Sequence, residues 1–159
     1  MKRTSKKENS KVHIEAGDIV DLILRDHKPI KALIKIMKSE DASLAQKKAA
    51  FAKFGPILKA HAKPEEKTWY KNMKFVDHMK VEGLEGDIEH GLADQLCKEL
   101  KRTGDKDMFK AKVKVLAEMV EHHIEEEEED MLPSFKRKSS KQERAELGET
   151  YEKLRQEYI

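Results

Sequence analysis

The sequence predicts an all-α protein: an up-down-up-down antiparallel four-helix bundle followed by a short extra C-terminal helix. Charged residues make up 40% of its 159 residues and hydrophobic residues 38%, with 7 Gly and 4 Pro. That composition favours long amphipathic helices over strands and turns. Apolar residues also recur at steps of three and four in four long stretches, each with one histidine on its apolar face. The length suits one domain with an adequate core.

Three segments are expected along the chain. Residues 1–12 carry little to bury and several basic side chains, so they are interpreted as a disordered basic tail. Residues 13–138 are expected to form the bundle, and residues 139–159 the C-terminal helix. Two further histidines are expected to be solvated: His13, at the start of the second segment, and His78, in the connection between the second and third helices.

The first helix is expected over residues 18–39. Its inner face contains one polar residue, His27, and Pro29 lies on the opposite face, where it predicts a local kink. The apolar members of that face are Ile19, Val20, Ile23, Leu24, Ile30, Leu33, Ile34 and Met37.

The second helix is expected to begin near Ser43, which has capping-box spacing with Gln46. Pro56 and Pro64 lie off its inner stripe and predict a bend. Residues 73–81 are expected to connect it to the third helix. One histidine and one glutamate four residues later belong to the inner stripe, which reads Phe51, Phe54, Leu58, His61, Glu65 and Thr68.

The third helix is expected over residues 81–102, with His90 toward one edge of its inner stripe. Gly104 should end it, and Asp105 should cap a fourth helix that stops before Pro133. The predicted inner stripe of the third helix is Leu84, Ile88, Leu92, Leu96 and Leu100.

The fourth helix contains six consecutive acids, of which only Glu127 shares a face with apolar residues. An unpaired buried carboxylate costs several kcal/mol, so Glu127 needs a partner, and a metal ion is the usual one. The residues of this face are Phe109, Val113, Leu116, Val120, His123, Glu127 and Met131.

A last helix is expected to begin at Ser140, which has capping-box spacing with Glu143. Its apolar stripe would pack across the bundle or onto a second copy of the chain. The residues of the stripe are Leu147, Tyr151, Leu154 and Tyr158.

An internal duplication links these polar core positions. Asp26-His27 recurs as Glu89-His90, 63 residues later, and His61-x-x-x-Glu65 recurs as His123-x-x-x-Glu127, 62 residues later. The spacing within each half brings two histidines to a similar depth in an antiparallel helix pair. Four helices would therefore each direct one histidine at the bundle axis.

Four imidazoles and two carboxylates without a thiolate suit iron or manganese and would also accommodate zinc. Six protein ligands are more than a protein usually supplies to one ion, and they fill only part of the coordination positions of two six-coordinate ions. If both glutamates bridge two ions and an oxo or hydroxo group bridges them as well, open positions remain for a small molecule. Such a centre would bind dioxygen or another small diatomic.

These motifs resemble the hemerythrin-like (HHE cation-binding) family of non-haem di-iron four-helix bundles. The resemblance covers about residues 18–135 and includes Met131-Leu132-Pro133 after the last motif. It implies a cofactor of two non-haem iron ions in an oxo- or hydroxo-bridged centre. The implied terminal ligands are His27, His61, His90 and His123, and the implied bridges are Glu65 and Glu127.

Two departures from oxygen-carrying hemerythrins stand out. Those proteins have a further histidine four residues before the one matching His90, where this chain has Gly86. They also have an aspartate five residues after the last histidine, where this chain has Glu128; helical phase favours Glu127 as the ligand instead. The candidates to replace the missing histidine as a metal ligand are Asp94, Glu89, His122 and solvent.

We expect a cytoplasmic protein that binds or senses dioxygen, iron or nitric oxide, with no further catalytic residue identified. The alternatives are a di-iron oxidase or a peroxide- or iron-handling enzyme, and a metal-free helical interaction module. A net charge of +2 with interspersed signs does not predict nucleic-acid binding, and no apolar run predicts a membrane span. The apolar stripe of the last helix leaves room for a homo-oligomer. The aromatic residues beside the second helix, including Trp69 and Tyr70, are expected in the core, where they would shield the metals.

Overall fold

The computed structural model describes residues 17–75 and 79–159. Within these ranges every regular element is helical and no strand occurs, which confirms the all-α prediction. None of the helices in the described ranges has the length and apolar character needed to cross a membrane. The predictions for the N-terminal tail, His13 and His78 concern residues outside those described.

The described residues form nine helical segments in order along the chain, and two of these, η1 and η2, are π-helical. They are α1 Ile19–Lys38, α2 Leu44–Glu65, η1 Glu66–Tyr70, α3 Lys71–Phe75, α4 Lys80–Arg102, α5 Lys106–Glu126, η2 Glu127–Met131, α6 Leu132–Lys138 and α7 Lys141–Gln156.

Side-chain caps fix the starts of four helices. The Asp18 carboxylate accepts from the amide of Val20, and Asp105 accepts from the amide of Met108. Ser43 forms the predicted capping box with Gln46. The Ser140 hydroxyl accepts from the amide of Glu143 to start α7. Each cap satisfies an amide that the first turn of a helix leaves without a partner.

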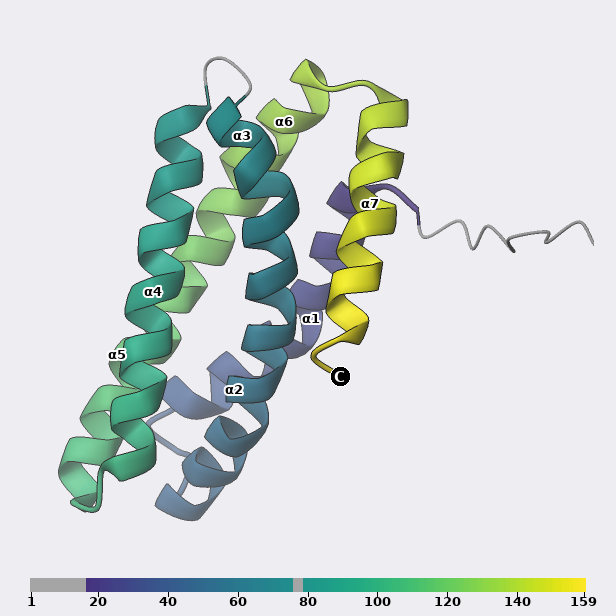
Figure 1. The fold of residues 1–159 in the computed structure, drawn as a ribbon. Helices are drawn as coiled ribbons and strands as arrows, with labels where there is room; N and C mark the ends of the chain where they lie inside the picture. The colour runs from purple at the N-terminus through teal and green to yellow at the C-terminus, as the bar shows by residue number, and fades with distance from the viewer. Residues whose placement is uncertain (1–16, 76–78) are drawn as a thin grey trace, which may run out of the picture.

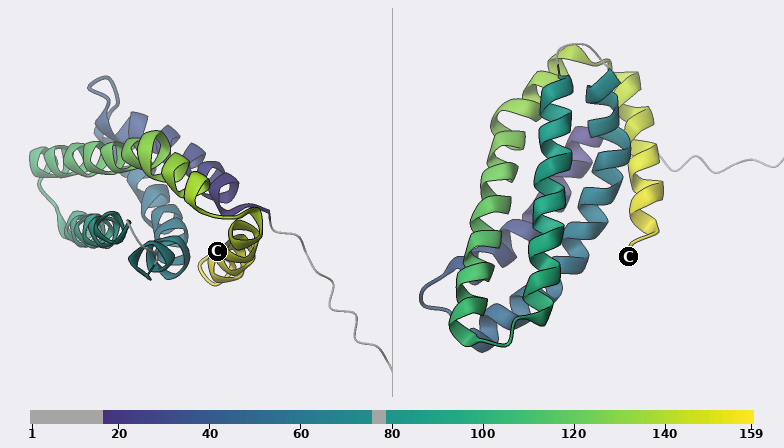
Figure 2. Two further views of the ribbon diagram at one scale, coloured as in Figure 1. Left: turned by 90° about the horizontal axis from the view of Figure 1, so that it is seen from above. Right: turned by 60° about the vertical axis from the view of Figure 1, so that its left-hand side comes forward.

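The four long helices α1, α2, α4 and α5 lie side by side (Figures 1 and 2). The α1–α2 and α4–α5 connections lie at one end of the molecule, and α3 and α6 lie at the other. Helix α7 packs along α1 and α2 of its own chain, with Tyr151 fully buried. The apolar stripe of the last helix therefore packs on its own bundle, and an oligomer through it stays a prediction.

Two apolar clusters make up the core. One contains Ile30 and Ile34 of α1, Phe54 of α2 and Leu116 of α5. The other contains Ile19 and Ile23 of α1 together with Trp69, Tyr70, Leu132 and Tyr151. On α1, His27 falls in sequence between Ile23 of the second cluster and Ile30 of the first.

The predicted inner face of the third helix is wrong over its first three residues and is confirmed at Leu100, which is 2% exposed. Leu84, Ile88 and Leu92 are 43%, 62% and 51% exposed. The buried residues of α4 are instead Gly83, Gly86, His90, Ala93, Cys97 and Leu100. This face is built from small side chains because Tyr70 and a pocket, both described below, occupy the space beside it.

Two predicted boundaries also differ. The helical backbone continues from α2 through η1 and α3 to Phe75, so the connection to α4 is shorter than residues 73–81. It also continues past Pro133, which lies in α6 just after the π turn of η2. A π turn follows His61-x-x-x-Glu65 and another begins at the glutamate of His123-x-x-x-Glu127. Such turns are frequent at functional sites.

Candidate metal centre

The structure brings all six predicted ligands together in the bundle interior. His27 comes from α1, His61 and Glu65 from α2, His90 from α4, His123 from α5 and Glu127 from η2. All six are buried, and His27, Glu65 and Glu127 are inaccessible to solvent. We refer to these six residues as the His/Glu cluster.

The His/Glu cluster divides into two groups that share a carboxylate. In the first, one ligand atom each of His27, His61, Glu65 and Glu127 lies within 4.8 Å of the others; in the second, the same holds for Glu65, His90 and His123. Glu127 also spans the groups, because its Oε1 lies 3.5 Å from His27 Nε2 and 3.3 Å from His123 Nε2. Two histidine pairs thus flank two carboxylates.

Several buried atoms of this cluster have no hydrogen-bond partner among the described residues. They include both ring nitrogens of His27, Oε1 of Glu65, Oε1 of Glu127 and Nδ1 of His90. Each unsatisfied buried polar atom costs about 1–3 kcal/mol, so a fold retains several of them only where something else binds there. Imidazole nitrogens and carboxylate oxygens are donors that iron, manganese and zinc accept. The cluster therefore fits a metal site.

The pKa values of the metal-free cluster shift in different directions. Burial lowers the pKa of His27 to about 3, which keeps its imidazole neutral. Burial also lowers the pKa of His61, but Glu65 and Asp26 outweigh it and bring that pKa to about 9. Burial and the neighbouring Glu65 carboxylate raise the pKa of Glu127, which favours the protonated form of this carboxyl group. A bound cation would replace these protons.

A hydrogen-bonded chain orients His61. Its Nδ1 lies 2.9 Å from the hydroxyl of Tyr151, which donates to Asp26 Oδ2 at 2.5 Å. Arg155 Nε also donates to that oxygen, at 3.1 Å. With Nδ1 occupied in this way, the Nε2 of His61 is left facing Glu65, 2.5 Å away. Partners of this kind set the tautomer and orientation of metal-binding histidines.

The other half of the duplication repeats this arrangement with different residues. Nδ1 of His123 lies 2.7 Å from Glu89 Oε2, which again leaves Nε2 for the cluster interior. The acid before His27 therefore supports His61, and the acid before His90 supports His123. The sequence identified both acids as parts of a repeat, but it did not indicate that each contacts the histidine of another helix.

Tyr70 is a functional candidate that the sequence placed in the core as a shield for the metals, without indicating a direct contact. Its hydroxyl lies 3.2 Å from His90 Nε2, 2.9 Å from His123 Nε2 and 2.8 Å from Glu127 Oε2. Its ring lies against Gly86, where an added Cβ would come within 2.5 Å of two ring atoms. Tyr70 thus contacts three members of the cluster from the last residue of η1.

The comparisons with known proteins identify the family. The sequence model of the hemerythrin HHE cation-binding domain matches residues 18–135, which is most of the chain. The chain belongs to the hemerythrin HHE cation-binding family. Searches of curated proteins and of solved structures found no match. The family match and the buried cluster together indicate a metal-binding protein.

The residues weighed as substitutes for the missing histidine lie elsewhere in this hemerythrin-family protein. His122 is 71% exposed at its side chain and pairs with Glu126. Asp94 pairs with Lys98 at 2.8 Å, and Glu89 is bound to His123. The hydroxyl of Tyr70 is the protein group that contacts the His90 and His123 side of the cluster. Glu128, the neighbour of Glu127, is partly exposed and pairs with Lys31.

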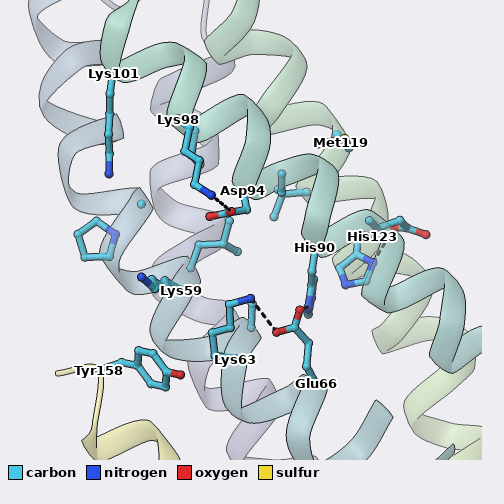
Figure 3. Close-up of a pocket in the computed structure, with 18 residues that line it drawn as sticks. Lys59, Lys63, Glu66, His90, Asp94, Lys98, Lys101, Met119, His123 and Tyr158 are labelled. Carbon is cyan, nitrogen blue, oxygen red and sulfur yellow. Dashed lines mark hydrogen bonds and ion pairs between the residues drawn. The ribbon is translucent and has the colours of Figure 1, made fainter. Parts of the chain in front are cut away.

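A pocket of about 380 Å³ opens beside the hemerythrin-family cluster, between α2 and α4 (Figure 3). His90 and His123 line one end of it. Tyr70 and the first group of ligands do not line it. The pocket gives small molecules a route to the second histidine pair.

Proposed function

We propose that this chain is a di-iron protein that binds or senses dioxygen or a related diatomic such as nitric oxide. Its α1, α2, α4 and α5 would form the up-down-up-down bundle around the metals. The observation that carries the proposal is the division of six buried ligands into two histidine pairs around two carboxylates. A single structural zinc ion would need only four ligands, and zinc sites of that kind more often include cysteine.

In this proposal His27 and His61 would hold one iron, His90 and His123 would hold the other, and the two would share Glu65 and Glu127. Iron supplies reversible redox chemistry and open coordination positions. The residues of the chain supply orientation: Tyr151 and Glu89 fix the rings of His61 and His123 through their Nδ1 atoms. The two apolar clusters keep bulk water away from the centre.

We assign Tyr70 as a further ligand or hydrogen-bond donor on the His90 and His123 side, since its hydroxyl contacts both rings and Glu127. That side would then have more protein donors than the His27 and His61 side. The diatomic would bind where fewer protein donors are present, on the His27 side. The free thiol of Cys97 is consistent with the reducing cytoplasm that we propose as the location.

The test is the metal content of purified variants, measured by mass spectrometry. His61→Ala and Glu127→Ala each remove a ligand, so we expect both to lose two-iron occupancy. His122→Ala is the matched control, because His122 lies on the same helix as His123 but is exposed. Two irons retained in both ligand variants would overturn the proposal, as would their loss in the control.

A second candidate function is a di-iron oxidase or peroxide-consuming enzyme. The pocket at His90 and His123 favours it, because a diatomic needs far less room than 380 Å³. Steady consumption of peroxide or dioxygen by the iron-loaded protein would support the enzyme, whereas one equivalent bound without turnover would support the binding protein. A metal-free interaction module would show the same melting temperature before and after chelation.

A further inference from the structure

The pocket between α2 and α4 has two chemically different parts (Figure 3). His90 and His123 lie at one side, and Lys59, Lys101 and Tyr158 lie at the opposite side. Its volume of about 380 Å³ is within the range of small-molecule sites, roughly 300–1,000 Å³. We call the first part the inner end and the second the outer end.

Much of the pocket wall is buried and apolar. Helix α2 contributes Leu58 and Ala62, α4 contributes Ala93 and Cys97, and α5 contributes Val120. The cavity exists because small side chains line both α2 and α4 at this level. Burial raises the pKa of the Cys97 thiol to about 11, so it is a neutral part of the wall. Such walls favour a hydrocarbon group over a polar one.

The ion pairs of the pocket leave a surplus of positive charge at its outer end. Glu66 pairs with Lys63 at 3.3 Å, and Asp94 pairs with Lys98 at 2.8 Å. The third acid, Glu89, is bound to His123 at 2.7 Å.

Two further lysines account for the surplus of positive charge. Lys59 of α2 and Lys101 of α4 line the same pocket, and neither forms an ion pair with any described residue. Two ammonium groups from opposite walls are thus available to an anion, because every acid that lines the pocket already has a partner.

We propose that this pocket binds a small amphipathic carboxylate. Its hydrocarbon part lies between Ala62, Ala93 and Val120, and its carboxylate lies against Lys59 and Lys101. The apolar end of the ligand then lies beside His90 and His123, where an organic acid is either a substrate or an effector of the metal centre. This inference goes beyond the binding of a diatomic, and the lysines and apolar residues that carry it are not among the proposed metal ligands.

Octanoate is the probe, with octanol as its uncharged analogue, and binding to the full chain is measured by calorimetry. We expect one octanoate per chain and affinity for octanol at least about tenfold lower, because octanol lacks the charge that the two lysines neutralise. Methyl NMR signals of Ala93 and Val120 should shift with octanoate, which locates the ligand in the pocket.

Variants distinguish the contribution of the two lysine charges to octanoate binding from that of the cavity. Lys59→Gln with Lys101→Gln should weaken octanoate about tenfold and leave octanol unchanged. Lys28→Gln with Lys110→Gln is the matched control, because both lysines are exposed and line no part of the pocket. Ala93→Phe should fill the cavity and abolish binding of both probes, with helicity by circular dichroism as the check on folding.

Three results would overturn the proposal: no octanoate binding, equal binding of octanol and octanoate, or unchanged binding in the Lys59/Lys101 variant. The same titration on His61→Ala separates it from the proposed di-iron function. Octanoate binding that persists in this variant supports the pocket even if the chain holds no iron. If the wild-type protein holds iron but does not bind octanoate, the di-iron function stands and the carboxylate site is refuted.

Discussion

A Cβ atom at position 86 would lie 2.5 Å from Cε2 and Cζ of Tyr70. The ring therefore occupies the space beside α4 that any larger residue would need, and its hydroxyl reaches His90, His123 and Glu127 from there. In oxygen-carrying hemerythrins, this position has the histidine that the chain lacks. Gly86 thus leaves the space that the Tyr70 ring occupies, although the two residues are distant in sequence.

Gly86→Ala should destabilise the metal-free protein by about 1–3 kcal/mol, because the added methyl group forces the fully buried Tyr70 ring to move. Urea unfolding followed by circular dichroism measures this change. Gly91→Ala, on the same helix, meets nothing within 4 Å and should stabilise by up to about 1 kcal/mol through helix propensity. In a Tyr70→Ala background the penalty of Gly86→Ala should vanish; a penalty of unchanged size there would refute the contact.

Tyr70→Phe should retain two irons and change the visible spectrum of the oxidised protein, because the only group removed is the hydroxyl that contacts the cluster. We expect loss of a phenolate-to-iron absorption band. Tyr151→Phe is the comparison, since its hydroxyl contacts Nδ1 of His61 and not the cluster interior, so the band should stay. Identical spectra for the wild type and Tyr70→Phe would show that the hydroxyl does not act on the metals.

Tyr151→Phe should instead lower metal affinity by about 10–100-fold, the usual effect of removing a group that orients a ligand. The substitution removes the hydrogen bonds to His61 Nδ1 and Asp26 Oδ2. Competition with a chelator measures the affinity. Tyr158→Phe, near the C-terminus and outside the cluster, should leave it unchanged; equal affinities in all three proteins would mean that α7 has no part in metal binding.

Metal binding at pH 7 should release at least one proton per chain, from His61. The pKa of His61 is about 9, so its imidazole is protonated before the metal arrives, and the raised pKa of Glu127 favours a proton there as well. Calorimetry in buffers of different ionisation enthalpy counts the protons. His61→Gln, if it binds metal at all, should release one fewer; release of no protons by the wild type would contradict the electrostatic description.

The same shifts set how the stability of the metal-free protein depends on pH. His61 has a raised pKa, so its contribution is complete below its usual value of 6.5 and is lost as the pH rises through about 9. His27 has a lowered pKa of about 3, so stability falls as the pH drops below 6.5. Glu127 also has a raised pKa, so its contribution is lost as the pH rises above its usual value of 4.5. Above pH 6.5 the His61 and Glu127 effects act in the same direction, so chemical unfolding of chelated protein should become easier from pH 6.5 to pH 9, and a steady rise in stability over that range would contradict this.

The helical phase of the sequence predicted the interior position of the His/Glu cluster well, because charged or polar residues on an apolar face are rare and conspicuous. His27, His61, His123 and Glu127 each replace one apolar residue in a regular stripe, and all are buried. The caps at Ser43 and Asp105 depend on two or three neighbouring residues, so they too could be predicted locally.

The buried face of α4 could not be predicted in this way. Periodicity gives most weight to large aliphatic residues, and Leu84, Ile88 and Leu92 form a regular stripe that faces outward. The inner face consists of small residues because Tyr70 fills the space beside Gly86. The π turn of η1 shifts the helical phase just before Tyr70, so the 3.6-residue period does not place its side chain.

The most direct test of the di-iron centre is the metal content of protein purified without added metal, combined with its visible spectrum before and after anaerobic reduction and return to air. We predict two irons per chain and an absorption that bleaches on reduction and returns with oxygen. No metal, or a single loosely held zinc ion with no visible absorption, would contradict the account.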